Sequence, residues 1–234
     1  MTPPITPSRL RCLLLVNWGI VTALGLTGEL YRNLAEFGKI PSWPKILSLS
    51  FEGNFPNWYS SGVLFCAAIL VAWNAIEERR RGGRHLLNWW CLSAIFFYIS
   101  LDESISIHEH MNEWFDFKGA LTFGWIIPAS VFLLVFGLSY VKFLIHLPKT
   151  TRIGFIIAGI IYVSGALGIE IPLGIWVTNT GSDDNLGYAL IDSVGESMEV
   201  LGTSFFIVAL LRHLIERTGA TLPGIAAGLQ SSRN

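Results

Sequence analysis

Long apolar segments separated by short polar connections dominate the sequence. Six of these segments have the length, about 20 residues, that an α-helix needs to cross the hydrocarbon core of a membrane. They cover residues 10–28, 57–76, 86–106, 121–146, 153–177 and 187–211. The pattern therefore predicts an all-α integral membrane bundle of six transmembrane helices. We expect residues 1–217 to form this single transmembrane domain and residues 218–234 to form a short C-terminal tail.

The composition agrees with a membrane protein. Of the 234 residues, 52% are hydrophobic and 14% are charged, and the mean hydropathy is +0.52. A soluble domain usually carries about 25% charged residues. The connections are too short for a soluble catalytic domain, so any activity is expected in or at the membrane. Membrane lipids are the expected partners, and the formal net charge of −1 excludes a nucleic-acid partner.

Basic residues gather at alternate connections, which predicts the orientation of the bundle. Arginine and lysine are retained on the cytoplasmic side of a membrane. The basic groups are Arg9, Arg11, Arg79, Arg80, Arg81, Arg84, Lys142, Lys149, Arg152, Arg212 and Arg217. Both termini are therefore predicted to be cytoplasmic, in the plasma (inner) membrane, with acidic connections on the periplasmic or extracellular side. These connections contain Glu109, Glu113, Asp116, Asp183 and Asp184.

The first apolar segment has a second interpretation, as a cleaved signal peptide. A cleavage site of the small-x-small type would then be expected directly after it. No such site follows Leu26, and the chain continues into Glu29-Leu-Tyr-Arg32. We therefore interpret residues 10–28 as the first transmembrane helix.

Several predicted helices carry a carboxylate at a similar depth. An α-helix rises about 1.5 Å per residue, so the distance from the nearest cytoplasmic arginine gives the depth of a side chain. Four carboxylates lie roughly 24–27 Å from the inner boundary, and they are Glu29, Asp102, Glu170 and Glu196. Carboxylates are costly in lipid and usually face the interior of a bundle, where they mark a site.

The sixth predicted helix carries a polar stripe. Its acids and one threonine are spaced at i, i+4, i+7 and i+11, so they share one face of an otherwise apolar helix. The residues are Asp192, Glu196, Glu199 and Thr203. Such a stripe must face protein or water, so we expect it to point into the bundle.

The third predicted helix ends in a cluster of acids and histidines, namely Asp102, Glu103, His108, Glu109 and His110. In a regular helix His108 would point to the side opposite Asp102 and Glu109. Residues seven apart are about 10 Å apart along a helix axis. One ion could therefore contact both Glu103 and His110 only if the helix breaks near Ser106.

The fifth predicted helix places Glu170 beside an irregular backbone. Pro172 has no amide hydrogen and cannot bond the carbonyl of Gly168, which leaves an additional oxygen near Glu170. Small residues on this helix would allow a neighbouring helix to approach closely. They are Gly154, Ala158, Gly165 and Gly168.

These acids and histidines favour a divalent metal site. Carboxylates that lie close together in a low-dielectric space cannot all be ionised, so they share protons or bind a cation. Carboxylates with one or two imidazoles suit iron, manganese or zinc. The predicted ligands are Asp102, Glu103, His108, Glu109, Glu170, Glu196 and Glu199. Glu170 and Glu196 are the predicted catalytic residues of a hydrolase or oxidoreductase whose lipid-like substrate enters between helices.

Two other functions are compatible with the same pattern. The acids could form a proton or cation relay in a small transporter, or the protein could be a non-catalytic accessory subunit of a membrane complex. The inner halves of the helices carry few ionisable groups, which favours a pocket open to the outside. Taken alone, each carboxylate could be a structural hydrogen-bond partner, and His108 and His110 could belong to a hydrated rim. The oligomeric state does not follow from the sequence.

Two short segments resemble a group of uncharacterised bacterial polytopic membrane proteins. They are Ser100-Leu-Asp-Glu103 with Ile107-His-Glu109, and Glu196-Ser-Met-Glu-Val-Leu-Gly202. In that group an Asp-Glu pair and a His-Glu pair close one span, and a Glu-rich turn followed by Leu-Gly lies in the last. The resemblance implies a bacterial membrane location and a shared site, and it implies no particular activity.

Overall fold

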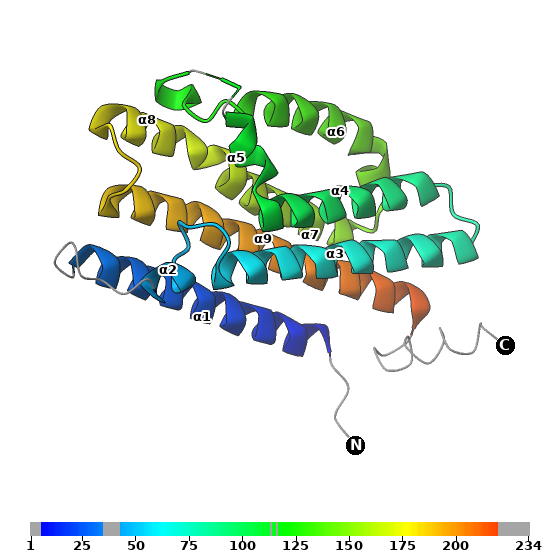
Figure 1. Cartoon of the computed structure of the whole chain (residues 1–234). Helices are drawn as coiled ribbons and strands as arrows, with labels where there is room; N and C mark the ends of the chain where they lie inside the picture. The colour runs from blue at the N-terminus through cyan, green and yellow to red at the C-terminus, as the bar shows by residue number, and fades with distance from the viewer. Residues whose placement is uncertain (1–5, 35–42, 113, 116, 220–234) are drawn as a thin grey trace.

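The computed structural model describes residues 6–34, 43–112, 114–115 and 117–219 (Figure 1). Glu113, Asp116 and residues 220–234, which include most of the predicted tail, lie outside the described residues. Within the described ranges the chain is all-helical and has no strand. The elements are α1 (Pro7–Leu34), α2 (Trp43–Leu47), α3 (Phe55–Arg80), α4 (Leu86–Ile105), α5 (Ile107–Asn112), the 3-10 helix η1 (Gly119–Leu121), α6 (Ile126–His146), α7 (Lys149–Val163), the π-helical turn η2 (Ser164–Gly168), α8 (Glu170–Thr180) and α9 (Leu186–Thr218).

Five helical segments in the described part of the chain are long and apolar enough to cross a membrane. They are Pro7–Asn33, Phe55–Arg80, Ile126–His146, Lys149–Thr180 and Leu186–Thr218. The remaining predicted span corresponds to α4, which has 20 residues but contains Asn88, two adjacent tryptophans and, near its end, Asp102 and Glu103. These residues lower its hydropathy. The all-helical membrane architecture is therefore confirmed, with five candidate spans in place of the six predicted.

Several helix boundaries differ from the prediction because local hydrogen bonding decides them. The fourth predicted span begins at Ile126, since η1 and a turn occupy residues 119–125. Asn54 caps α3 by accepting the Asn57 amide hydrogen at 3.1 Å. The last helix continues to Thr218, where Gly219 adopts a left-handed conformation with φ of 64° and ends it.

The last helix, α9, is the centre of the bundle and packs against α1, α3, α7 and α8 (Figure 1). Small residues permit the close contact with α7, as predicted for Gly154, Ala158 and Gly165. A Cβ atom on Gly202 would lie 2.7 Å from the Tyr162 backbone nitrogen, and one on Gly165 would lie 2.6 Å from the Gly195 carbonyl oxygen. Gly168 has only ordinary contacts, so the prediction fails at that position.

The bundle has two chemically different ends. The start of α1, the α3–α4 and α6–α7 connections and the end of α9 lie together at the right in Figure 1, and the predicted cytoplasmic arginines and lysines belong to these segments. We call this the basic end. The opposite end contains α2, α5 and the junction of α8 with α9, and we call it the acidic end.

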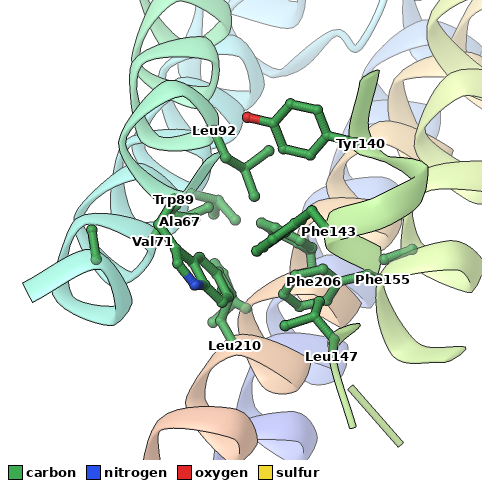
Figure 2. Packing of buried hydrophobic residues seen from close by; sticks show 14 residues of the cluster. Ala67, Val71, Trp89, Leu92, Tyr140, Phe143, Leu147, Phe155, Phe206 and Leu210 are labelled. Carbon is green, nitrogen blue, oxygen red and sulfur yellow. The ribbon is translucent and has the colours of Figure 1, made fainter. Parts of the chain in front are cut away.

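Aromatic side chains fill the bundle near its basic end (Figure 2). Trp89 of α4 is 1% exposed and meets Phe143 of α6 edge to face, with ring centroids 5.0 Å apart. Phe155 of α7 and Phe206 of α9 pack at 4.6 Å. We call these four residues the aromatic cluster. Such pairs each contribute about 0.5–1.5 kcal/mol beyond the burial of apolar area.

The helix α6 is anchored through the half near the basic end. Tyr140 and Phe143 are buried, and the Tyr140 hydroxyl donates a hydrogen bond to the Asn88 carbonyl at 2.8 Å. In the other half, Val131 and Leu134 are 60% and 64% exposed, as expected for side chains in contact with lipid. This arrangement makes α6 one wall of an internal space.

Candidate functional site

A cavity of about 1100 Å³ lies between α4, α6, α7, α8 and α9. Its walls are mostly apolar and include Phe132, Phe136 and Phe206. Pockets that hold small ligands usually enclose about 300–1,000 Å³, so this large cavity has room for a lipid-sized molecule. Six predicted site residues line it, namely Asp102, Glu103, His108, Glu170, Glu196 and Glu199. They come from the end of α4, from α5, from the start of α8 and from α9.

A smaller cavity of about 60 Å³ shares part of this lining. His108, Glu170 and Glu196 line both cavities, so the two spaces meet at these three side chains. Glu109 lines the small cavity and is absent from the lining of the large one. The structure thus brings six of the seven predicted residues to one space and places the seventh beside it.

The break between α4 and α5 decides where His108 points. Ser106 has a φ of 56°, in the left-handed region that non-glycine residues rarely adopt, and α4 ends there. The chain turns back, so the His108 amide donates to Asp102 Oδ1 at 2.9 Å and His108 Nδ1 lies 3.0 Å from Asp102 Oδ2. The helix breaks at Ser106, so the condition under which His108 would point away from Asp102 is not met.

His110 does not belong to the site. Its side chain is exposed, its Nδ1 lies 2.8 Å from the Ser106 carbonyl oxygen, and it lines neither cavity. Its position fits the predicted alternative of a hydrated rim. The helix break therefore places His108 at the cavities and leaves His110 exposed.

The α2–α3 connection and the first turn of α3 supply residues that the sequence did not identify. Glu52 accepts a hydrogen bond from the Ser106 hydroxyl and lines the small cavity. Asn57 donates to the Glu103 carbonyl oxygen at 2.6 Å and to Glu103 Oε1 at 3.3 Å. These residues thereby fix the end of α4 and add a carboxylate. Only the acidic character of Glu52 and its place before a helix hinted at this role.

Glu170 follows the π-helical turn η2 and begins α8. The Ile169 amide donates to the Ser164 carbonyl at 3.0 Å, a bond that spans five residues. Such turns inside α-helices often occur at functional sites. Glu170 Oε2 is buried and has no hydrogen-bond partner among the described residues, and the same holds for the indole Nε1 of Trp125, which also lines the large cavity.

The predicted polar stripe on α9 faces the two cavities. Asp192 lines the small cavity, Glu196 lines both, and Glu199 lines the large one, followed by Thr203. The helical spacing therefore predicted correctly that this face points into the bundle.

Glu29 lies apart from the other acids despite its similar depth. Its side chain is completely buried, forms an ion pair with Arg32 at 3.1 Å and accepts a hydrogen bond from Ser48. It lines neither cavity. Depth alone did not reveal that the face of α1 carrying Glu29 meets the α2–α3 connection, so Glu29 has the structural role that we considered for single carboxylates.

Comparison with known proteins gives one match. Residues 11–214 match the model of a family described as a domain of unknown function, DUF8692. The chain belongs to this family. The match spans nearly all of the described helical bundle, including every residue that lines the cavities. No curated protein and no solved structure matches the chain.

Negative groups are in large excess in the lining of the two cavities. Within the described residues this lining contains no lysine or arginine, and His108 is the single imidazole. Eight carboxylates line the two spaces, and they are Glu52, Asp102, Glu103, Glu109, Glu170, Asp192, Glu196 and Glu199. We call this set the acid cluster. A cation or shared protons must offset it.

His108 of α5 and Glu52 of the α2–α3 connection have shifted pKa values. Burial lowers the pKa of His108, but the hydrogen bond to Asp102 and the charges of Glu52 and Glu103 raise it more, to about 9. His108 is therefore protonated at neutral pH. Burial raises the pKa of Glu52, and the hydrogen bond from Ser106 offsets only part of this increase.

The geometry does not support the predicted metal site. In the ranges that the structure describes, no three His, Cys, Asp or Glu side chains are arranged to hold a metal ion. The donors of His108 and Asn57 already occupy oxygens of Asp102 and Glu103. The acid cluster is spread along two cavities and does not converge on one point, so we derive no chemistry from iron, manganese or zinc.

The aromatic cluster closes the large cavity toward the basic end. Phe143, Phe155 and Phe206 belong both to the lining and to the buried core (Figure 2). Beyond them, Trp89 stacks on His213 with ring centroids 5.5 Å apart. The cavity therefore has one polar end and one apolar end that meets the buried aromatic core.

Proposed function

We propose that the protein is a six-span membrane protein that takes a lipid-like molecule into the large cavity and acts on its polar group by acid–base chemistry. The observation that carries this proposal is the form of the cavity. A long apolar space of about 1100 Å³ leads to a cluster of ionisable side chains at one end. An amphiphilic molecule has the same division into an apolar chain and a polar head.

The sixth span in this proposal is α4. Its 20 residues match the thickness of the hydrocarbon core, and it runs back along α3 from the α3–α4 connection (Figure 1). With α4 included, the arginine-bearing connections all belong to one side of the membrane. The positive-inside rule makes that side cytoplasmic, so the acid cluster faces the periplasm or the exterior.

The three residues shared by the cavities are the proposed reaction centre. Glu170 and Glu196 can exchange protons with a water molecule and with the polar group of the substrate, one as base and one as acid. Protonated His108, held in place by Asp102, would stabilise negative charge that develops on the substrate oxygen. Hydrolysis fits this set because water is the only co-substrate that it needs.

A transport function has less support. A transported ion would have to pass the aromatic cluster, where Trp89 and Phe143 are each 1% exposed and tightly packed. A closed inner end favours a pocket that receives and releases its ligand on one side. We therefore prefer an enzyme to a proton or cation relay.

A cavity-filling substitution tests the proposed binding. A Cβ atom on Gly159 of α7 would meet nothing within 4 Å, and Gly159 lines the large cavity. Gly159→Leu should therefore occupy the cavity without straining the fold. Gly62→Leu on α3 is the matched control, because its Cβ also meets nothing within 4 Å and it does not line the cavity. Lipids bound to each detergent-purified protein are identified by mass spectrometry.

We expect one class of bound amphiphile in the wild type and in Gly62→Leu, and its loss in Gly159→Leu. Equal bound lipids in all three proteins would contradict the proposal. For the reaction, the purified protein is incubated with a bacterial lipid extract and the products are analysed by mass spectrometry. Glu170→Gln and Glu196→Gln should each abolish product formation, and full activity in both would show that these carboxylates are structural.

A further inference from the structure

The acid cluster differs in how well its carboxylates are paired. Asp102 accepts hydrogen bonds from His108, and Glu103 accepts one from Asn57. By contrast, Glu170 Oε2 is buried without a hydrogen bond of normal geometry among the described residues, with the Trp125 indole beside it, and Glu196 has no donor there. The two carboxylates at the junction of the cavities therefore have free acceptor capacity.

The surroundings of this junction offset only part of its negative charge. His108 is the single cationic side chain in the described lining, against eight carboxylates, and its Nδ1 is engaged by Asp102. Arg32, which lies at this end of the bundle, pairs with Glu29 and Asp184 and lines neither cavity. A buried acceptor without a donor costs about 1–3 kcal/mol, and more when it is charged. A ligand that brings positive charge and N–H donors would remove this cost.

We infer that the cavity selects an amphiphile with a cationic amine head, which lies between Glu170 and Glu196 while its apolar chain extends along α6 toward the aromatic cluster. This inference rests on the proposed function and names its substrate class. An ammonium group offers several N–H donors to carboxylate oxygens, and such charge-assisted bonds are about twice as strong as neutral ones. Trp125 lies beside this position and can interact with a cation through its ring.

The same environment disfavours the other classes of head group. An anionic head would place its charge among the carboxylates of α4, α8 and α9, where like charges repel. A neutral alcohol would fill the apolar part of the cavity equally well, but it would leave the negative charge of Glu170 and Glu196 unbalanced. The charge of the head group, and not the chain, should therefore decide affinity.

The experiment compares three probes that share one alkyl chain. Dodecylamine, dodecanol and dodecanoate are titrated at neutral pH into the full chain in phosphatidylcholine nanodiscs, with empty nanodiscs to correct for partition into lipid. Binding is measured calorimetrically. The proteins are the wild type, Glu170→Gln, Glu196→Gln, the cavity-filling Gly159→Leu and, as a control, Asp183→Asn, which removes an exposed carboxylate from the same end of the bundle. Thermal unfolding of each variant first verifies that it is folded.

We expect dodecylamine to bind the wild type at least about tenfold more tightly than either other probe, which corresponds to about 1.4 kcal/mol. This preference should be lost in Glu170→Gln or Glu196→Gln and retained in Asp183→Asn. Equal binding of dodecylamine and dodecanol, both abolished by Gly159→Leu, would overturn the cationic head and leave the proposed function standing. Binding of no probe beyond the empty nanodiscs would overturn both.

Discussion

The two ends of the bundle each bury carboxylates, but they treat them differently. At the basic end, Glu78 is 4% exposed, forms an ion pair with Arg217 at 2.5 Å and accepts a hydrogen bond from the His85 amide at 3.3 Å. At the acidic end, Glu170 and Glu196 line the cavities without a lysine or arginine, and His108 is the single cationic side chain in the described lining. A paired buried acid holds helices together, whereas an unpaired one lowers stability.

This comparison separates the structural acids from the acids that we propose bind a ligand. Glu78 pairs with Arg217 and Glu29 pairs with Arg32. The described lining of both cavities has no lysine or arginine, and His108 is its single cation, so the proposed cationic ligand would supply the remaining positive charge. Substitutions at the two ends should therefore have opposite effects on stability.

The largest effect is expected from Arg217→Met at the basic end. This change leaves Glu78 buried without its partner, which should destabilise the protein by about 3–5 kcal/mol. Unfolding by a denaturing detergent, followed by circular dichroism, measures the loss. The double variant Glu78→Gln/Arg217→Met should recover most of it, and single and double variants of equal stability would show that the pair is unimportant.

The close contact between α7 and α9 gives the next largest effect. Gly202→Leu directs a side chain into the backbone of α7 at Ala158 and Tyr162, so it should destabilise by about 3 kcal/mol. The midpoint of thermal unfolding is the readout. Gly159→Leu, with open space around it, should unfold at the wild-type temperature, and an equal loss in both variants would contradict this account of the packing.

The pairing of His108 with Asp102 should make stability depend on pH. The pKa of His108 is about 9 in the folded protein, above its ordinary value of 6.5. The stabilisation is thus fully present below pH 6.5 and is lost as the pH rises through about 9, by up to about 3 kcal/mol. Thermal unfolding across this range should show the loss in the wild type, and a much flatter profile is expected for Asp102→Asn. Identical pH profiles of stability in the wild type and in Asp102→Asn would show that the His108–Asp102 pair does not stabilise the fold.

The smallest effect, with the opposite sign, is expected from Glu196→Gln. This variant removes a charge that faces other carboxylates, so it should raise stability by about 1 kcal/mol while it weakens ligand binding. Thermal unfolding without added ligand measures the change. A clear loss of stability would mean that Glu196 is paired in the folded protein, and the contrast between the two ends would then fail.

Local periodicity made part of the fold and site predictable. The apolar segments correspond to real helices because about 20 residues are needed to cross a membrane. The acids on α9 face the cavities because residues at i, i+4 and i+7 share one helix face. The small residues Gly154 and Gly165 mark a close contact because side chains would block it.

Other features depend on contacts between distant segments and could not be read from the sequence. The left-handed conformation of Ser106 turns the chain so that His108 points toward Asp102. The sequence has no glycine at this position, which would have indicated such a conformation. Glu52 and Asn57 reach the site because the α2–α3 connection and the first turn of α3 lie against the end of α4. Glu29 shares its depth with the site but faces elsewhere, since counting residues gives height in the membrane and says nothing of lateral position.

The most direct test of the cavity is photo-crosslinking with a dodecylamine that carries a diazirine in its chain. Peptide mapping by mass spectrometry then locates the labelled residues. We predict that labels concentrate on cavity-lining residues such as Phe132 and Phe206, and that unlabelled dodecylamine or Gly159→Leu removes them. Labels of equal intensity on lipid-facing residues such as Ile20 and Leu13 of α1, unchanged by either treatment, would show that the amphiphile only dissolves in the surrounding lipid and that the cavity is not its binding site.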